Sequence, residues 1–324
     1  MKDQEKPSVA IRCLVYNHEL YLRQCLDSIV MQITDFPYFA VVHDDCSNDN
    51  SVAIIKEYHS KYPNKIVPIF EIKNCYTTDW RVADRKITEA YGTAKYIATC
   101  EGDDYWTDPY KLQKQVDFLE SHPDYAVCAH ETIITDEQYH TQDQLYSKVV
   151  INNSIIPKTR IDYTFNDTLK GNIFHLSSML YRHKDLIEFP QWRYRISAGD
   201  MILFRYLGSC GKTYWFPDVM SVYRGHMGSV THTESVYNSA IRFNELNIKV
   251  MRLLNRFWNR KYQNRIYPII AQYYADNAWL YTKRSMRNIA RCKTMLQIAL
   301  RYNKYWALNY LFKKIVHRLF MIFW

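Results

Sequence analysis

The sequence predicts an α/β fold built on a mostly parallel sheet flanked by helices, with a helical extension at the C-terminus. Three observations support this prediction. Short apolar runs alternate with segments of helical periodicity over about the first 130 of the 324 residues. Acidic clusters directly follow two of those runs, and from Ile241 onward the pattern is helical and strongly basic. A chain of this length can form a substantial core and two structural units.

The first part of the chain alternates strand and helix in a regular order. Strands are expected at Ser8–Tyr16, Phe39–His43, Lys65–Phe70 and Tyr96–Cys100, and helices at Glu19–Gln32, Ser51–Tyr62, Thr88–Ala94 and Asp108–Ser121. In the last of these helices Asp108 is expected to cap the first turn, which contains Pro109. Strands separated by such helices favour parallel pairing, and parallel sheets bind ligands beyond the carboxyl ends of their strands.

The following segment is less regular. We expect a loop at Asn152–Thr168, a helix at Met201–Leu207, and strands at Ile173–Tyr181, Thr213–Phe216 and Met220–Tyr223. The helical pattern that begins near Ile241 is interrupted near residues 259–264 and 301–305. The expected division is therefore an α/β domain over residues 1–239 and a basic helical extension over residues 240–324.

The formal charge of +9 is unevenly distributed. Residues 241–324 contain 17 Lys and Arg against two acids, whereas the rest of the chain contains 25 against 31. This asymmetry predicts a separate anionic partner for the extension, either a membrane surface or a nucleic acid. The polar N-terminus shows no secretory signal, no apolar run reaches 18 residues, and the eight cysteines lack metal-binding spacing. These features predict a cytoplasmic protein.

Glu101, Asp103 and Asp104 follow the fourth expected strand and precede the helix expected at Asp108. Carboxylate oxygens are the ligands that Mg²⁺ and Mn²⁺ prefer, and Mg²⁺ is usually held by one or two carboxylates together with substrate phosphates. Three acids within four residues repel one another unless a cation lies between them. The cluster predicts a site for a divalent metal and a diphosphate. The alternative is a solvated turn that caps the helix.

A second acidic cluster, Asp44, Asp45 and Asp49, follows the second expected strand at the same edge of the sheet. One of its carboxylates could accept a hydrogen bond from a nucleobase imide. The alternative is a turn whose acids cap the helix at Ser51.

Four motifs occur in a fixed order along the chain: Val9-Ala10-Ile11 with Asn17-His18-Glu19, then Asp44 to Asp49, Gly92 to Ile97, and Glu101 to Trp106. In this order and spacing the sequence resembles glycosyltransferase family 2 over roughly residues 7–230, and most of all its bacterial cell-surface polysaccharide branch. The resemblance implies a GT-A fold and an inverting transfer from a nucleoside-diphosphate sugar, with a UDP-sugar favoured. The implied acceptor is a hydroxyl of a glycan or of a lipid-linked glycan.

The resemblance also implies roles for individual residues. Asp45, with Asp44 beside it, matches the family's base-recognising acid, and Asn17 falls at the nucleotide. Cys46 stands where the family usually has glycine, so this position must avoid a positive φ or adopt one at a cost.

In the second motif Asp103 and Asp104 match the family's metal-binding element, with Glu101 in place of its first aspartate. The resemblance implies that Asp103, with Glu101, binds the metal and that Asp104 lies at the nucleotide. Asp200 matches the catalytic base, which removes the proton of the attacking hydroxyl and typically contributes ~10²–10⁴-fold. The usual preceding Glu is Gly199 here, and the alternative for Asp200 is a helix N-cap.

Arg224 and His226 match an element that returns to the nucleotide, where an Arg can neutralise a diphosphate and an imidazole can bind Mn²⁺. Arg85 is a candidate for contact with the nucleotide, the alternative being a solvated helix face. Trp106, Trp192 and His175 are candidates for binding the acceptor, although aromatic residues of this kind serve equally well in a core.

The end of the extension has its own pattern. In Leu308–Trp324 apolar residues recur at helical spacing, and Lys313, Lys314 and Arg318 fall on the opposite side. A basic amphipathic helix rich in Phe and Trp is typical of an interfacial membrane anchor. The alternative is packing against the catalytic domain, and nucleic-acid binding is not expected because no recognised module accompanies the charge.

We therefore interpret the sequence as that of a metal-dependent glycosyltransferase, peripheral on the inner face of a bacterial plasma membrane. One rival is a sugar nucleotidyltransferase, which would require a glycine-rich loop after the first strand, where Tyr16 to Glu19 contain no glycine. Another rival is a non-catalytic scaffold that binds a nucleotide sugar at the membrane.

Overall fold

The computed structural model describes residues 8–136, 144–146, 161–171, 173–196, 198–226, 236–282, 288–310 and 312. The chain divides into two compact units, Met1–Met227 and Gly228–Trp324. The boundary expected after residue 239 falls inside helix α8 (Val236–Phe257), which continues well beyond it.

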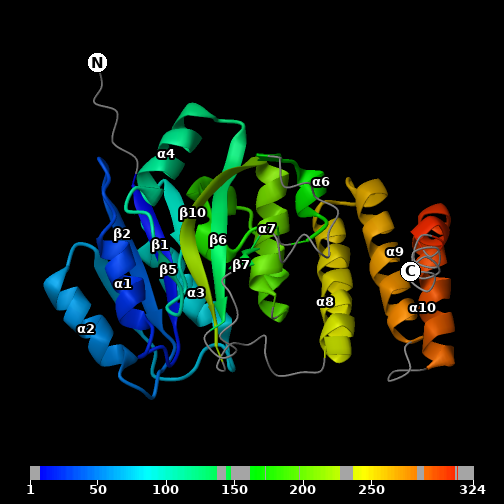
Figure 1. The fold of residues 1–324 in the computed structure, drawn as a ribbon, viewed down its shortest axis with the longest axis horizontal. Helices are drawn as coiled ribbons and strands as arrows, with labels where there is room; N and C mark the ends of the chain where they lie inside the picture. The colour runs from blue at the N-terminus through cyan, green and yellow to red at the C-terminus, as the bar shows by residue number, and fades with distance from the viewer. Residues whose placement is uncertain are drawn as a thin grey trace. The chain divides into compact units, whose positions relative to one another are not determined.

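The first half of the N-terminal unit is a parallel sheet. Its strands are β1 (Val9–Val15), β2 (Tyr38–Asp44), β3 (Ile66–Phe70) and β4 (Tyr96–Thr99), in the order β3-β2-β1-β4. Helices α1 (Leu22–Val30), α2 (Ser51–Lys61) and α3 (Trp80–Ala90) connect them, as Figure 1 shows. All three pairings are parallel, so the carboxyl ends of the four strands lie at one edge. The predicted order of elements is confirmed here.

The second half of the unit makes the sheet mixed rather than mostly parallel. Strands β9 (Leu180–Arg182), β6 (Tyr125–Asp136), β10 (Lys212–Gly225) and β5 (Tyr105–Trp106) continue the order from β4. Among the described strands of this half, only β10 and β6 pair in parallel, whereas β9 and β5 run antiparallel to their neighbours. The short strands β7 (Gln144–Leu145) and β8 (Asp162–Tyr163) pair antiparallel with β6 and β10, and the described α-helices of this half are α4 (Lys111–Ser121), α6 (Phe165–Thr168) and α7 (Gly199–Cys210).

Both faces of the sheet are covered, which explains why its central strands are almost wholly apolar. Alternate residues of β1, such as Ile11 and Cys13, pack with α1 on one face, where Leu22 and Leu26 are fully buried. Ala10 faces the other core, together with side chains of α3 and α7. Each fully buried aliphatic side chain contributes roughly 1.5–3 kcal/mol, so these two layers hold the strands and their loops in place.

Several predicted elements differ from the structure. Helix α3 begins at Trp80 after the cap Asp79, well before the predicted Thr88. The prediction began too late because the sequence of this helix is polar and only Ala83 and Ile87 are buried. The predicted strand Ile173–Tyr181 is wrong for most of its length, since Leu176–Ser178 form a 3₁₀ turn before β9.

Two further element boundaries differ from the prediction for local reasons. The two short strands expected between Thr213 and Tyr223 are one strand, β10, with register shifts that accommodate Pro217. Helix α4 begins at Lys111 after the N-cap Tyr110, while the Asp108 carboxylate accepts the Tyr110 N–H at 2.8 Å.

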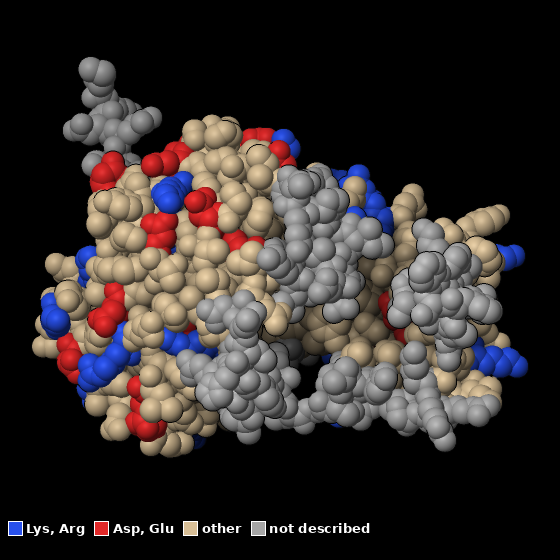
Figure 2. Space-filling model, viewed as in Figure 1, with Lys and Arg blue, Asp and Glu red and all other residues tan. Residues whose placement is uncertain are grey.

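The C-terminal unit contains α8, α9 (Gln263–Leu280) and α10 (Ile289–Tyr302). Its described interior includes a buried hydrogen bond from Asn244 to Asn277, with an N···O distance of 2.7 Å. None of the described helices is both long and apolar enough to cross a membrane. Figure 2 shows acidic and basic atoms interspersed over the N-terminal unit. The predicted amphipathic segment lies outside the described residues from residue 313 onward.

Candidate active site

Loops from three neighbouring strands meet at the carboxyl edge of the parallel half-sheet. The loops after β1 and β2 are joined by hydrogen bonds: Ser47 Oγ accepts the Asn17 N–H at 2.9 Å, and Asn17 Oδ1 accepts the Asn48 N–H at 2.8 Å. Asp49 Oδ2 accepts the Glu19 N–H at 2.9 Å. Asn17 adopts a left-handed backbone with φ of 57°, which asparagine tolerates better than most residues. Its side chain therefore shapes the loop.

The loop after β4 is pressed against the loop after β1. Gly102 donates its N–H to the Leu14 carbonyl at 2.9 Å. A Cβ on Gly102 would lie 2.8 Å from His18 Nδ1 and 2.9 Å from Val15 Cγ2. Glycine is required by this close approach, which fixes where Asp103 and Asp104 emerge.

Asp103 lies between two histidines. Its Oδ2 is 3.1 Å from His226 Nε2, at the end of β10, and 3.7 Å from His18 Nε2, after β1. The ring of Tyr21 lies 4.7 Å from that of His226 and supports it. Burial lowers the pKa of His18, although the nearby Asp103 charge opposes the shift. The structure thus brings His226 to Asp103, and an imidazole and a carboxylate here are suitable ligands for Mn²⁺.

Asp104 is buried and held from β10. Its Oδ1 accepts the Arg224 N–H at 3.2 Å, and the Arg224 guanidinium donates to the Asp103 carbonyl at 2.7 Å and to Gln24. Burial, followed by the charge of Asp103, raises the pKa of Asp104 well above its ordinary value. His175 Nδ1 lies 3.8 Å from Asp104 Oδ2. Arg224 and His175 therefore both belong to the surroundings of the loop that follows β4, residues 101–104, which we call the acidic loop.

Glu101 contacts a cation inside the sheet. Its Oε1 is 3.4 Å from an Arg12 guanidinium nitrogen. Burial raises the pKa of Glu101 to about 7, Arg12 opposes this shift, and the charges of Asp103 and Asp200 add to it. Asp200 is exposed in the first turn of α7, whose N-cap is Ala198, so Asp200 is not the cap. Its charge acts on Glu101, which relates α7 electrostatically to the acidic loop.

The acidic loop suits a divalent cation. Burial of Glu101 and Asp104 beside Asp103 penalises their negative charge, and a bound cation would relieve that penalty. Within the described residues, no group of three His, Cys, Asp or Glu side chains forms a ready-made metal site. This arrangement matches the way Mg²⁺ is bound through one or two carboxylates, with substrate phosphates completing its coordination.

The acids after β2 have different surroundings. Asp44 Oδ1 accepts the Ser47 N–H at 3.0 Å, while its Oδ2 is buried without a hydrogen-bond partner among the described residues. The two oxygens of Asp45 accept the N–H groups of Cys75 and Tyr76 at 2.6 and 2.9 Å. Asp45 therefore already binds the loop that follows β3.

Three further predicted residues have surroundings of their own. Trp106 is 1% exposed, and its indole N–H donates to the Ser177 carbonyl at 2.9 Å, so it belongs to the core and cannot stack on an acceptor. The Arg85 side chain extends into solvent from α3, with its Nε 4.0 Å from Glu89 Oε1. This position matches the alternative given for Arg85, a solvated helix face. Trp192 is partly exposed in the 3₁₀ segment Gln191–Arg195.

Two residues at the site were not predicted. His18 belongs to a motif that served only to identify the family resemblance, and nothing in its spacing indicates that its Nε2 faces Asp103. Arg12 carries a signal that could have identified it, namely a single charge within an otherwise apolar strand. Some neighbours of the predicted strand Ile173–Tyr181, of Asp200 and of His226 lie outside the described residues, namely Asn172, Ser197 and Ser229.

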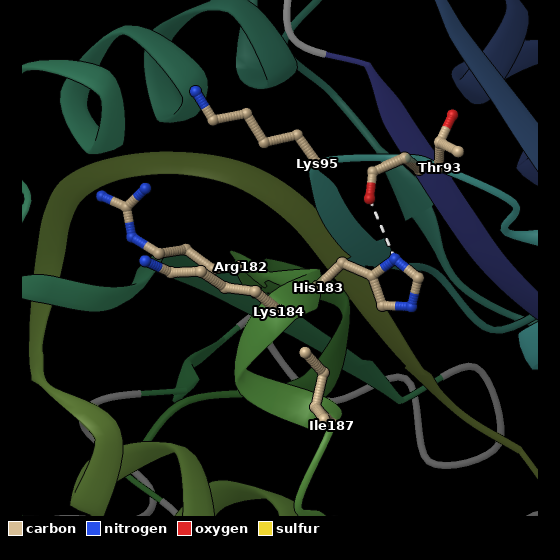
Figure 3. Close-up of a pocket in the computed structure, with 7 residues that line it drawn as sticks. Thr93, Lys95, Arg182, His183, Lys184 and Ile187 are labelled. Carbon is tan, nitrogen blue, oxygen red and sulfur yellow. Dashed lines mark hydrogen bonds between the residues drawn. The ribbon is translucent and has the colours of Figure 1, made fainter.

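A cavity of about 320 Å³ lies elsewhere, lined by residues that include Lys95, Arg182 and Lys184. Figure 3 shows these three side chains extending to one side, while the His183 ring turns the other way and bonds to the Ala94 carbonyl at 2.9 Å. Lys95 precedes β4, whereas Glu101 follows it, so this cavity is at the opposite end of the strand from the acidic loop. It is not the candidate active site.

Comparison with known proteins is consistent with this geometry. The model of the family described as Glycosyl transferase family 2 matches residues 13–188. An uncharacterized protein of Mycobacterium tuberculosis is 31% identical over 240 residues, covering 72% of this chain and 63% of that protein. This chain therefore spans less than two thirds of that relative's length.

Two solved structures share the fold at low identity. S. aureus TarS in complex with UDP-GlcNAc gives a TM-score of 0.52 at 16% identity, covering 94% of this chain and 91% of that chain. The mannosyltransferase PcManGT from Pyrobaculum calidifontis, in complex with GDP-Man and Mn²⁺, gives 0.58 at 15% identity, covering 98% and 81%. The predicted GT-A fold is confirmed by these likenesses.

Proposed function

The chain belongs to glycosyl transferase family 2, and from that premise we propose that it moves a sugar from a nucleoside-diphosphate sugar to an acceptor hydroxyl. A UDP-sugar is the favoured donor, and a glycan or lipid-linked glycan of surface polysaccharide synthesis is the favoured acceptor. One observation supports this most strongly: Asp103, Asp104, Arg224 and His226, from β4 and β10, meet at one edge of the sheet.

The diphosphate end of the donor is proposed to lie at the acidic loop. Asp103 and His226 would hold a Mg²⁺ or Mn²⁺ ion, with Glu101 close by, and the ion supplies charge stabilisation to the diphosphate. Arg224 already donates to the Asp103 carbonyl, and its cation can neutralise the departing diphosphate. Asn17, Asp44, Asp45 and Asp104 are proposed to shape the nucleotide site.

Asp200 is proposed as the catalytic base. It is exposed at the start of α7, and its charge acts on Glu101 across the site. It would take the proton of the acceptor hydroxyl while that oxygen attacks the anomeric carbon opposite the diphosphate. A single displacement of this kind inverts the configuration. His175 and Trp192 remain the proposed acceptor contacts.

The test is turnover of a panel of nucleotide sugars with Mn²⁺ by the wild-type chain, followed by Asp200→Asn. The variant should bind donor as the wild type does but lose at least about 10²-fold in kcat, since a general base contributes that much. Glu188→Gln, which changes another exposed acid, is the matched control. Normal turnover by Asp200→Asn would reject the base assignment, and no turnover of any donor by the wild type would reject the function.

A second proposal concerns the basic extension, which we propose binds an anionic membrane surface. Tyr305, Leu308 and Phe312 are 87%, 49% and 66% exposed and recur at helical spacing, so they form an exposed apolar face. The full chain should therefore sediment with vesicles that contain anionic lipid. The double variant Leu308→Glu, Phe312→Glu should sediment less, and equal sedimentation would reject the proposal.

A further inference from the structure

The loop between β3 and α3, residues 71–79, is bound to Asp45 along its middle. Asp45 Oδ1 accepts the Cys75 N–H at 2.6 Å, and Oδ2 accepts the Tyr76 N–H at 2.9 Å. The Asn74 amide donates in turn to the Asp45 carbonyl at 3.3 Å. One aspartate thus holds three consecutive residues of this loop.

Both ends of the loop are also fixed. The Glu71 N–H donates to the Asp44 carbonyl at 3.0 Å, and the Glu71 carboxylate lies 2.7 Å from Lys86 and 3.3 Å from buried His43. At the other end Asp79 accepts the Arg81 N–H and caps α3. The loop therefore has a defined shape.

The interior of the loop is closed by Asn74. Its side-chain oxygen accepts the Thr77 N–H at 2.9 Å, and its carbonyl accepts the Thr78 hydroxyl at 2.6 Å. Cys75 is buried beneath this turn, with 6% of its surface exposed, whereas the next residue, Tyr76, is 62% exposed. A rigid backbone thus presents one aromatic ring to solvent, and a tyrosine with two side-chain torsions loses little entropy when it binds.

The strand order places the loop of residues 71–79 relative to the acidic loop. In the order β3-β2-β1-β4, residues 71–79 and the acidic loop leave the same edge three strand spacings apart, or roughly 14 Å. A nucleoside diphosphate whose phosphates lie at Asp103 and Arg224 can extend its nucleoside across β1 and β2 toward β3. The base then arrives at the loop that contains Tyr76.

We infer that Tyr76 binds the face of the nucleobase and that Asp45 is a positioning residue, which holds residues 71–79 so that Tyr76 can do so. The inference rests on the proposed function, because it requires a nucleotide donor. Asp45 then acts on the nucleotide through the loop, and its two oxygens remain bound to the N–H groups of Cys75 and Tyr76.

Tyr76 is tested by calorimetry of UDP binding in the presence of Mn²⁺. Stacking of a base on an aromatic ring contributes binding free energy whichever base is stacked. Tyr76→Ala should therefore weaken UDP binding about 10-fold, while Tyr76→Phe keeps nearly full affinity. Donor KM should rise by a similar factor with kcat preserved at saturation. Tyr110→Ala, which removes a tyrosine that is 49% exposed ahead of α4, is the matched control.

Asp45 is tested without any nucleotide, by amide hydrogen exchange. Asp45→Ala should speed exchange at Cys75 and Tyr76 by at least 10-fold, whereas a matched change at exposed Asp117 should leave both amides protected. In binding measurements Asp45→Asn should weaken UDP, CDP and GDP by similar factors, because the whole loop is displaced.

Three results would overturn the inference: unchanged exchange at both amides in Asp45→Ala, a base-selective loss in Asp45→Asn, or wild-type affinity for UDP in Tyr76→Ala. Either of the first two results would favour the alternative role of Asp45, which is direct recognition of the nucleobase. They leave the proposed function intact. Failure of the wild type to bind any nucleoside diphosphate with Mn²⁺ would instead defeat the proposed function, and the nucleobase contact with it.

Discussion

The loops after β2 and β4 both contain three acids within six residues, at the same edge of one sheet, but their surroundings are opposite. After β2, Asp44, Asp45 and Asp49 accept backbone N–H groups. After β4, Glu101, Asp103 and Asp104 lie beside one another, with Arg12, Arg224 and imidazoles around them.

The pKa directions express the same contrast. Burial acts to raise the pKa of Asp49, but hydrogen bonds from Ser51 and Glu19 outweigh it and hold that pKa below its ordinary value. Burial raises the pKa of Glu101 and Asp104, and the charge of Asp103 raises it further. Asp49 is thus stabilised as an anion by hydrogen bonds from the protein itself, whereas burial penalises the negative charge of Glu101 and Asp104, and we propose that a bound cation relieves this penalty. We infer from this contrast that an acidic cluster favours a bound cation where burial, rather than hydrogen bonding, dominates its surroundings.

The largest expected effect distinguishes the two clusters directly. Asp103→Asn should weaken metal-dependent nucleotide binding by roughly 10²-fold, because it removes the carboxylate proposed to hold the ion. Asp49→Asn should preserve the metal dependence and lower the melting temperature, since Asp49 accepts the N–H of Glu19. Calorimetry with and without Mn²⁺ measures the first effect and thermal unfolding the second. Equal metal dependence in Asp103→Asn and wild type would remove the distinction.

Packing under the loop after β4 gives the next effect. Gly102→Ala should lower the free energy of unfolding by about 1–3 kcal/mol, because its Cβ would meet His18 Nδ1 at 2.8 Å and the Leu14 carbonyl at 3.1 Å. At Gly199 an added Cβ meets nothing within 4 Å, so Gly199→Ala is the matched control and should be neutral or slightly stabilising. Urea unfolding of both variants measures the difference. A Gly102→Ala protein as stable as wild type would show that the two loops are not closely packed.

A pH dependence of stability should follow from Glu101. Its pKa is raised from 4.5 to about 7, so the folded state binds its proton more tightly than the unfolded state does. The metal-free protein should therefore lose stability as pH rises from about 4.5 to 7, on the order of 1–2 kcal/mol. Bound Mn²⁺ should oppose this loss.

Thermal unfolding across that pH range, with and without Mn²⁺, measures the effect. Glu101→Gln should flatten the metal-free profile, because the amide cannot titrate. Stability that rises over this range in the wild type, and not in Glu101→Gln, would contradict the raised pKa.

The smallest expected effect is at the loop after β2. Cys46 adopts φ of 67°, a left-handed conformation that a side chain with Cβ disfavours. Cys46→Gly should stabilise the protein by less than about 1 kcal/mol, because relief of the strain is partly offset by the greater freedom of glycine when unfolded. Cys46→Ala retains the Cβ and should give no such gain. Destabilisation by Cys46→Gly would show that the thiol itself has a role in the loop.

Much of the parallel half-sheet was predictable because its strands are continuous apolar runs. The acidic residues at strand ends followed from the same pattern. Helix α3 was predicted too late in the chain, since only Ala83 and Ile87 of its eleven residues are buried and its periodicity is faint. Trp106 was misassigned because an aromatic residue beside a site and an aromatic residue in a core have the same local sequence, and only burial distinguishes them.

Sequence alone specified the fold class, the family and the edge of the sheet that carries the candidate site, because apolar periodicity and motif order are local properties. It could not distinguish acids that bind a loop from acids whose negative charge is penalised by burial. That difference depends on residues far apart in the chain, such as Asp45 with Tyr76 and Asp103 with His226. Folding decides it, since hydrogen bonds and desolvation act through space and set which carboxylates remain uncompensated.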